Sequence, residues 1–450
     1  MTMAGSSPHP LNVLVAGGGV AGLEVLLALR HLAGNRIERT LLTPEDEFVY
    51  RPMAVAEPFA RGHAQRHRLD AIAHDLGARL VRGSLADVDD RTRTATTSTG
   101  ERLSYDALVV AIGARSELAL ERALTWTPES DGEIYGGLLR DVEEGFTKRL
   151  AFVIPPGVAW PLPGYELALM TAWDARGMGI NDVQITIYTP EGAPLELFGA
   201  VAAQALREEL DELGIQVVTG AYVADAPDGQ LVVEPGARRL DADRVVALPR
   251  AAGPALPGVL SDAHGFIRCD RYGKVYDTTT VWAAGDAIAF PVKQGGLAAQ
   301  QADAVAEEIA ARAGADVRPQ PFRPVLRGVL LTGRGQAWMR NVVAGGDGEG
   351  EAQRRALFWP PTKIAGRYLS PYLAALDRAP AVGEIPQPSG HPVELDLDLD
   401  RPAAADGRQA AAAEQPTPSH GASGSRPRGE RPDSLRRPLA SLHHRKVPHD

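Results

Sequence analysis

The chain has 450 residues, of which 44% are apolar and 23% are charged, and its formal net charge is −10. This length predicts two or three domains with a sizeable core, and the negative charge gives no indication of nucleic-acid binding. The single cysteine, Cys269, excludes an intramolecular disulfide and a cysteine metal cluster, and we predict no metal site.

No targeting or membrane-spanning segment is predicted. The first ten residues, MTMAGSSPHP, lack a positively charged region, and the apolar stretch after them is interrupted by GGG and by Glu24. No apolar run reaches the roughly 18 residues of a membrane-spanning helix. We therefore expect a cytoplasmic protein, with peripheral attachment to a membrane as an alternative.

The first motif is typical of a dinucleotide-binding turn. LNVLVAGGGVAGLEVLLALRHL (11–32) has the pattern of a strand, a tight turn and a helix. In Gly17-x-Gly19-x-x-Gly22 the first glycine permits the bend, the second lets a pyrophosphate approach, and the third allows close helix–strand packing. Val20 and Ala21 stand at the start of the helix, whose free N–H groups would meet the phosphate charge.

The second strand, RTLLT (39–43), departs from the usual pattern. An acidic residue normally ends this strand and binds the adenosine ribose. Here Thr43 occupies that place, followed by Pro44 and Glu45. We expect either Thr43 or Glu45 to bind a ribose hydroxyl.

Two later segments complete a nucleotide site. YDALVVAIGAR (105–115) reads as a buried strand that ends in a turn containing Ala111 and Gly113. VWAAGDA (281–287) is a strand followed by Gly285 and Asp286, which places a carboxylate where a cofactor hydroxyl could bind. KQGGLAAQQADAVAEEIAAR (293–312) then begins a helix whose N-terminus offers N–H groups to an anion.

The order GGGVAG, VVAIGA, VWAAGDA and KQGGLAAQQA resembles the FAD-binding frame of the pyridine-nucleotide–disulfide oxidoreductase superfamily. The segment TLLTPEDEFVYRP (40–52) resembles the branch of type II NADH dehydrogenases, sulfide:quinone oxidoreductases and flavocytochrome c sulfide dehydrogenases. The resemblance covers about residues 11–312 and implies an α/β fold with two Rossmann-like domains. It implies that the FAD domain is split by an inserted NAD(P)-type domain.

The resemblance also implies a set of cofactor-binding residues. Three glycines would line the FAD pyrophosphate, Asp286 would face the ribityl or phosphate region, and the helix from about Gly295 would point at the flavin N1/C2=O edge. Lys293 is a catalytic candidate that could add positive charge there, and a solvated surface lysine is the alternative. The predicted cofactor-binding residues are Gly17, Gly19, Val20, Ala21, Gly22, Thr43, Glu45, Ala111, Gly113, Gly285, Asp286, Gln294, Gly295, Gly296 and Leu297.

The second dinucleotide loop is rich in proline and lacks the usual glycine pattern. Residues 149–190 have the layout of a second βαβ unit, with strands over 150–154 and 183–188 and a helix from about 164. The loop, FVIPPGVAWPLPGYE (152–166), does not match GxGxxG, and its prolines lack N–H donors for a pyrophosphate. We therefore expect this domain to bind NAD(P)H weakly or not at all.

Glu166 is the other catalytic candidate. The sequence Pro163-Gly164-Tyr165-Glu166 resembles the end of the loop in type II NADH dehydrogenases, where a glutamate lies near the flavin. The alternative is an acid in the first turn of a helix, where the dipole favours it. Sulfide oxidation by the family's cysteine route is disfavoured, because no cysteine precedes Cys269, which we expect to be a structural thiol.

We predict five parts of the chain: an FAD domain (1–150 and 246–315), the inserted domain (151–245), a flavin-covering or interface segment (316–380) and a disordered tail (381–450). The segment 316–380 carries apolar residues interleaved with basic ones, and we expect them to form part of the core, a dimer interface or a membrane-facing patch: Leu357, Phe358, Trp359, Tyr368, Leu369, Tyr372 and Leu373. In the tail, residues 401–450 hold nine Lys and Arg against five Asp and Glu.

These observations predict an FAD-dependent oxidoreductase that passes electrons from a small donor to an acceptor, with a quinone as the candidate acceptor. Three alternatives stay open from the sequence. One is an NAD(P)H:acceptor oxidoreductase, another is a non-catalytic flavin- or nucleotide-binding protein, and the third is a dehydrogenase with NAD in the Gly17 loop.

Overall fold

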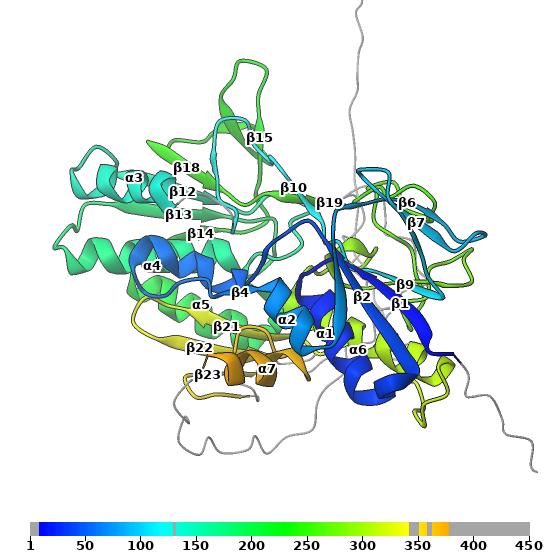
Figure 1. Cartoon of the computed structure of the whole chain (residues 1–450). Helices are drawn as coiled ribbons and strands as arrows, with labels where there is room; N and C mark the ends of the chain where they lie inside the picture. Colours follow the sequence, from blue (N-terminus) through cyan, green and yellow to red (C-terminus); the bar gives the residue numbers. More distant parts are fainter. Residues whose placement is uncertain (1–8, 129–131, 342–350, 358–361, 378–450) are drawn as a thin grey trace, which may run out of the picture. The chain divides into compact units, whose positions relative to one another are not determined.

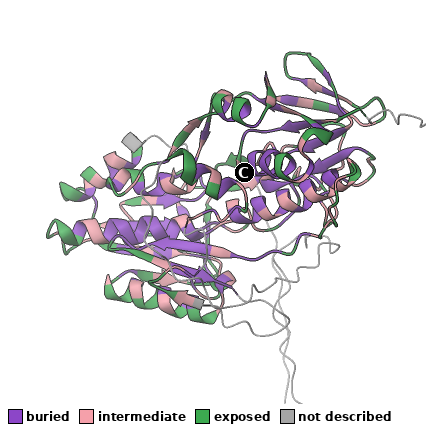
Figure 2. Ribbon diagram, turned by 60° about the horizontal axis from the view of Figure 1, so that its bottom comes forward, coloured by how far each residue is buried: buried purple, intermediate pink, exposed green. Residues whose placement is uncertain are grey.

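Two parallel sheets organise the part of the chain that the structure describes. The computed structural model describes residues 9–128, 132–341, 351–357 and 362–377. They lie within one compact unit, Met1–Pro402, whereas the second unit, Ala403–Asp450, and the predicted disordered tail lie outside the described residues. Figure 2 shows the buried residues concentrated in the strands and on the inner sides of the helices.

The first sheet joins segments that are far apart in the sequence. Its strand order is β20-β9-β1-β2-β5, and every neighbouring pair is parallel. The strands are β1 (Leu11–Ala16), β2 (Ile37–Thr43), β5 (Ala78–Arg82), β9 (Ala107–Val110) and β20 (Val281–Ala283). Because β20 pairs with β9 after an intervening second sheet, the predicted split of the first domain is confirmed (Figure 1).

Two long helices pack together on the strands of this first sheet. Helix α1 (Val20–Ala33) contacts α6 (Gly295–Arg312), and their apolar side chains share one core with the strands. Small alanine side chains in α6 permit a close approach of the two helices. Short elements complete the domain: η1 (Gly34–Arg36), β3 (Glu47–Val49), η2 (Arg51–Phe59), β4 (Arg66–Arg68), α2 (Leu69–Asp75), β6 (Leu85–Asp89), β7 (Thr94–Thr97), β8 (Arg102–Ser104) and η4 (Gly285–Ala287).

The second sheet is also parallel, with the order β11-β18-β12-β13-β14. Its strands are β11 (Leu124–Thr125), β12 (Arg149–Val153), β13 (Gln184–Tyr188), β14 (Gln216–Val218) and β18 (Arg244–Ala247). Thus β12 and β13 match the predicted strands to within one residue at each end. Strand β11 joins this sheet from the N-terminal side of residue 150.

Helices and two further small sheets surround these strands. The helices are α3 (Gly132–Glu143), α4 (Leu162–Gly177), η3 (Glu196–Phe198) and α5 (Ala200–Glu212). An antiparallel sheet contains β15 (Tyr222–Asp225), β16 (Leu231–Glu234) and β17 (Arg238–Arg239). Strand β10 (Arg115–Glu117) pairs with β19 (Arg250–Ala252) where the chain enters and leaves the insertion.

The C-terminal segment touches both sheet domains. It forms the hairpin β21 (Arg327–Leu331) and β22 (Gln336–Arg340), the strand β23 (Glu351–Gln353) and helix α7 (Leu369–Leu376). Strand β21 contacts α4, β23 contacts α5, and α7 contacts α1. From the predicted apolar set, Leu357, Leu369 and Leu373 are buried core residues, whereas Phe358 and Trp359 lie outside the described residues.

Candidate functional site

The glycine loop after β1 has the geometry that a dinucleotide requires. Gly17 has a φ of +118°, and a Cβ there would lie 2.1 Å from the Ala111 carbonyl oxygen. A Cβ on Gly22 would lie 1.9 Å from the Gly17 carbonyl oxygen, so neither position accepts a side chain. Gly19, in contrast, faces open space. The two crowded glycines and the open one fit the three roles predicted for the motif.

Helix α1 begins directly at this loop. It starts at Val20, and its N-cap residue, Gly19, supplies no side-chain hydrogen bond. The first N–H groups of a helix have no intrahelical acceptor. The loop therefore presents donors and the positive end of a helix dipole at the place where a pyrophosphate is expected.

The other predicted pieces meet at the same edge of the sheet. The Ala111 N–H donates to the Ala16 carbonyl at 2.8 Å, which joins the ends of β9 and β1. A Cβ on Gly285, whose φ is +79°, would lie 3.0 Å from the Ala21 Cβ, which places the end of β20 beside α1. Gly113 has a φ of +74° and faces open space. Three segments, of which the first and last are more than 250 residues apart in the sequence, are thus brought together.

Thr43 and Glu45 form a compact turn at the end of β2. The buried Thr43 hydroxyl donates to a Glu45 carboxylate oxygen at 2.5 Å, and the Glu45 N–H faces the Thr43 oxygen at 3.4 Å. The glutamate itself is exposed. Thr43 therefore orients the Glu45 carboxylate rather than presenting its own hydroxyl to a ligand.

Asp286 and Lys293 lie close enough to influence each other. Burial raises the pKa of Asp286, which Lys293 and Arg51 oppose. Burial also lowers the pKa of Lys293 to about 8, and Asp286 is the main group that opposes this. The Lys293 ammonium donates to the Ile288 carbonyl and lies 3.8 Å from the centre of the Phe266 ring. Lys293 is thus a partly buried cation and not a solvated surface lysine.

The start of α6 is capped and covered by the chain itself. The Gln294 side chain accepts the Leu297 N–H at 2.8 Å and donates to the Arg327 carbonyl at 3.2 Å. A Cβ on Gly295 would lie 2.7 Å from the Ile364 side chain, and one on Gly296 would lie 2.9 Å from the Gln294 side-chain oxygen. The predicted residues Gln294–Leu297 do form the first turn, and the C-terminal segment packs over it.

Glu166 is buried in an ion pair that the sequence does not reveal. The Lys363 ammonium lies 2.6 Å and 2.8 Å from its two carboxylate oxygens, and the Leu331 N–H donates to it at 2.9 Å. Because α4 begins at Leu162, Glu166 does not lie in the first turn, and the helix-dipole explanation is wrong. The pair ties α4 to the C-terminal segment. A catalytic role for Glu166 stays a prediction.

Glu24 occupies the matching position in α1. Like Glu166, it stands two residues after the third glycine position of its loop and is fully buried. Its carboxylate accepts the N–H groups of Tyr368 at 2.8 Å and Leu369 at 2.6 Å, at the start of α7. Both glutamates therefore anchor the C-terminal segment.

The proline-rich loop leaves few donors before α4. Pro161 is the N-cap residue, Pro163 lies in the first turn, and the Gly164 N–H donates to the Pro161 carbonyl at 3.0 Å. Trp160 packs edge-on against Phe198, with ring centres 5.8 Å apart. A Cβ on Gly328 would lie 2.5 Å from the Phe198 ring, so the ring is held against β21. Apolar side chains fill the edge of the second sheet beside this loop.

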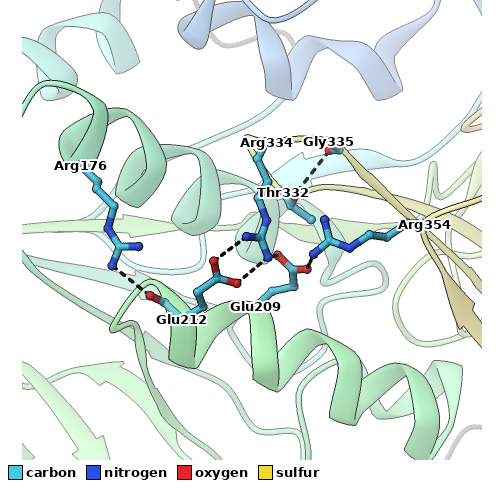
Figure 3. A network of polar contacts seen from close by, with 7 residues as sticks. All are labelled: Arg176, Glu209, Glu212, Thr332, Arg334, Gly335 and Arg354. Carbon is cyan, nitrogen blue, oxygen red and sulfur yellow. Dashed lines mark hydrogen bonds and ion pairs between the residues drawn. The ribbon is translucent and has the colours of Figure 1, made fainter.

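The C-terminal hairpin is further attached by ion pairs (Figure 3). Arg334 binds Glu209 at 2.9 Å and Glu212 at 2.5 Å, and Arg354 also binds Glu209. Arg61 binds both the Gly333 carbonyl and Asp174. No local motif in the sequence marks these contacts or Lys363.

Cys269 is partly buried, and burial raises the pKa of its thiol to about 12. A thiol with such a pKa is a poor nucleophile, as expected of a structural cysteine. Among the described residues, no helix is both long and apolar enough to cross a bilayer.

Comparisons with known proteins agree with this geometry. The family model of pyridine nucleotide-disulphide oxidoreductases matches residues 7–144 and 163–306, which leaves the proline-rich loop as far as Leu162 outside the matched segments. The ferredoxin–NAD(+) reductase component of the biphenyl dioxygenase system from Paraburkholderia xenovorans is 28% identical over 63% of this chain and 69% of its own. An NADH dehydrogenase-like protein of Mycobacterium tuberculosis is 28% identical over 62% of this chain and 73% of its own.

A solved structure shows the same fold. The sulfide:quinone oxidoreductase from Aquifex aeolicus superposes with a TM-score of 0.69, covering 76% of this chain and 87% of its own at 20% identity. At that identity the likeness concerns the fold and not the reaction.

Proposed function

Because the chain belongs to the pyridine nucleotide-disulphide oxidoreductase family and is an FAD-dependent oxidoreductase, we propose that its electron donor is neither NADH nor NADPH and that its acceptor is a small quinone. The observation that carries this proposal is the loop before α4. Four of the ten residues from Pro155 to Gly164 are prolines without an N–H, and the N–H groups of Val158 and Gly164 are used within the loop. A nicotinamide nucleotide would find too few donors for its pyrophosphate.

The residues that would hold FAD belong to the first sheet domain. The N–H groups after Gly17 would bind the pyrophosphate, Glu45 would accept a hydroxyl of the adenosine ribose, and Asp286 a hydroxyl of the ribityl chain. When bound, FAD supplies the two-electron chemistry. Lys293 and the N-terminus of α6 would favour negative charge at this place.

The acceptor side is proposed to lie along the C-terminal segment. Residues 362–369 cross the start of α6 and bind both buried glutamates. Lys363 binds Glu166, and the N–H groups of Tyr368 and Leu369 donate to Glu24. In this proposal Glu166 and Lys363 are the polar pair of the acceptor side. Peripheral membrane contact, a homodimer and a cytoplasmic location stay predictions.

An NAD(P)H:acceptor oxidoreductase is the second candidate. It is favoured by the relatives whose names include NADH dehydrogenase-like protein and ferredoxin–NAD(+) reductase component. Their similarity extends over most of this chain, but the family match is interrupted at residues 145–162, where the nucleotide phosphates would bind.

Anaerobic rapid-mixing experiments on the purified holoprotein separate the two candidates. NADH, NADPH, sulfide and small organic reductants are mixed with the protein one at a time, and the flavin absorbance is followed. We expect slow, non-saturating reduction by both nicotinamide nucleotides, and rapid reoxidation of chemically reduced protein by a short-chain quinone. Rapid reduction that saturates at micromolar NADH or NADPH would overturn the proposal in favour of the second candidate.

A further inference from the structure

The two sheet domains carry the same short pattern twice. In the first domain Gly22-Leu23-Glu24 lies near the start of α1, and Thr43-Pro44-Glu45 lies at the end of β2. In the second domain Gly164-Tyr165-Glu166 lies near the start of α4, and Thr189-Pro190-Glu191 follows β13. The repeated pattern makes the two units directly comparable, residue by residue.

The two Thr-Pro-Glu turns have the same internal geometry. Thr189 is fully buried, as Thr43 is, and its hydroxyl donates to a Glu191 carboxylate oxygen at 2.8 Å. The Glu191 N–H lies 3.3 Å from the Thr189 oxygen, against 3.4 Å in the first turn. Glu191 therefore stands where the acid that reads a nucleotide ribose is expected at the end of the second strand.

The two turns differ in what their carboxylates contact. Glu45 is exposed, and the residue of α1 that corresponds to Tyr165 is the apolar Leu23. In the second domain the Tyr165 hydroxyl donates to the same Glu191 oxygen at 2.6 Å. Tyr165 is fully buried, and the other Glu191 oxygen is buried without a hydrogen-bond partner among the described residues.

We propose that Tyr165 is a specificity-determining residue that closes the ribose position of the second domain by holding the Glu191 carboxylate inside the protein. A carboxylate bound by Tyr165 and Thr189 and turned into the interior does not accept the 2′-hydroxyl of an incoming NADH. The proline-rich loop weakens binding of the nucleotide pyrophosphate, and Tyr165 prevents binding of the ribose hydroxyl. This inference rests on the proposed function, because it explains how the second domain rejects nicotinamide nucleotides.

The substitution Tyr165→Phe tests this proposal, since it removes only the hydroxyl. Glu191 then loses its donor from α4 and becomes available to a ribose hydroxyl. Because a hydrogen bond to a charged group is typically worth a factor of ten or more, we expect the second-order rate constant for flavin reduction by NADH to rise about tenfold. The rate with NADPH should stay within about twofold, because its 2′-phosphate is repelled by the carboxylate.

Tyr135→Phe is the matched control. Tyr135 is also fully buried, and its hydroxyl pairs with Thr171 of α4 at 3.0 Å, away from Glu191. This variant should react with NADH at the wild-type rate. Adding Glu191→Gln to Tyr165→Phe should abolish the preference for NADH over NADPH.

Two outcomes would overturn the proposal. One is an unchanged NADH rate in Tyr165→Phe with full flavin content, and the other is an equal increase with NADH and NADPH, which would indicate loosened packing. If Tyr165→Phe does not hold flavin, the single variant Glu191→Gln still tests the proposal. We expect it to be reduced by NADH at the same slow rate as wild type. A loss would show that Glu191 already faces the nucleotide. Rapid saturable reduction of the wild-type protein would instead contradict the proposed function itself.

Discussion

Lys363 and Glu166 form an ion pair in which both side chains are almost completely buried, with 7% and 1% of their surfaces exposed. The two residues come from the C-terminal segment and from α4, which are distant in sequence. Burial raises the pKa of Glu166, and the nearby Lys363 opposes that shift. The pair thus holds the segment that covers the start of α6 against the inserted domain.

We expect Lys363→Met to lower the free energy of unfolding by about 3–5 kcal/mol, because it leaves the Glu166 charge buried and unpaired. The double variant Glu166→Gln, Lys363→Met should recover most of that loss, since it buries no net charge. Denaturant unfolding of the wild-type, single and double variants measures both effects. A single variant as stable as wild type would show that Glu166 is already neutral. Turnover of the double variant, if it is stable, then measures any catalytic contribution separately.

This pair also shows what the sequence could not reveal. The glycine loop at Gly17 was predictable because the steric demands of a tight turn act within a few residues. The position of Asp286 was predictable because strand, glycine and acid are consecutive. Glu166 and Lys363 are 197 residues apart, and the contact depends on how the C-terminal segment crosses the other two domains. The prolines indicated a lost phosphate loop, but neither they nor any other local pattern indicated the bond between Tyr165 and Glu191.

Gly19→Leu should abolish flavin binding and leave the fold intact. A Cβ at Gly19 meets no atom within 4 Å, so a leucine fits the protein but occupies the space through which the pyrophosphate approaches. We expect a colourless protein with a wild-type circular dichroism spectrum. Gly177→Leu is the control, because it makes the same change at another open position, at the end of α4. Full flavin content in Gly19→Leu would refute the assignment of this loop.

Lys293→Met should lower the midpoint potential of the bound flavin, because a positive charge near the site favours the reduced, anionic form. Burial lowers the pKa of Lys293 to about 8, so this charge is present at pH 7 and is lost as the pH rises through and beyond that value. We therefore expect the potentials of wild type and variant to differ at pH 7 and to converge towards pH 10. Spectroelectrochemical titration at several pH values measures this. A constant difference across the range would show that Lys293 acts through packing.

The ion pairs between α5 and the C-terminal hairpin should contribute unequally to stability. Glu209 is 13% exposed and binds both Arg334 and Arg354, whereas Glu212 is 48% exposed and pairs with Arg334. Because solvent screens the more exposed pair, Glu209→Gln should destabilise the protein more than Glu212→Gln, by about 1–3 kcal/mol for Glu209. High salt should further reduce the destabilisation caused by Glu212→Gln.

The effect of Glu212→Gln should also depend on pH in a defined direction. Arg334 holds the pKa of Glu212 below its ordinary value of 4.5. A carboxylate with a lowered pKa in the folded state stabilises the protein above its unfolded pKa, and this contribution is lost as the pH falls through the folded-state value. The free energies of unfolding of wild type and Glu212→Gln should therefore differ at pH 7 and converge as the pH falls below 4.5 and through the folded-state pKa. A difference that persists in acid would mean that the glutamate acts through its packing against Arg334 rather than through its charge.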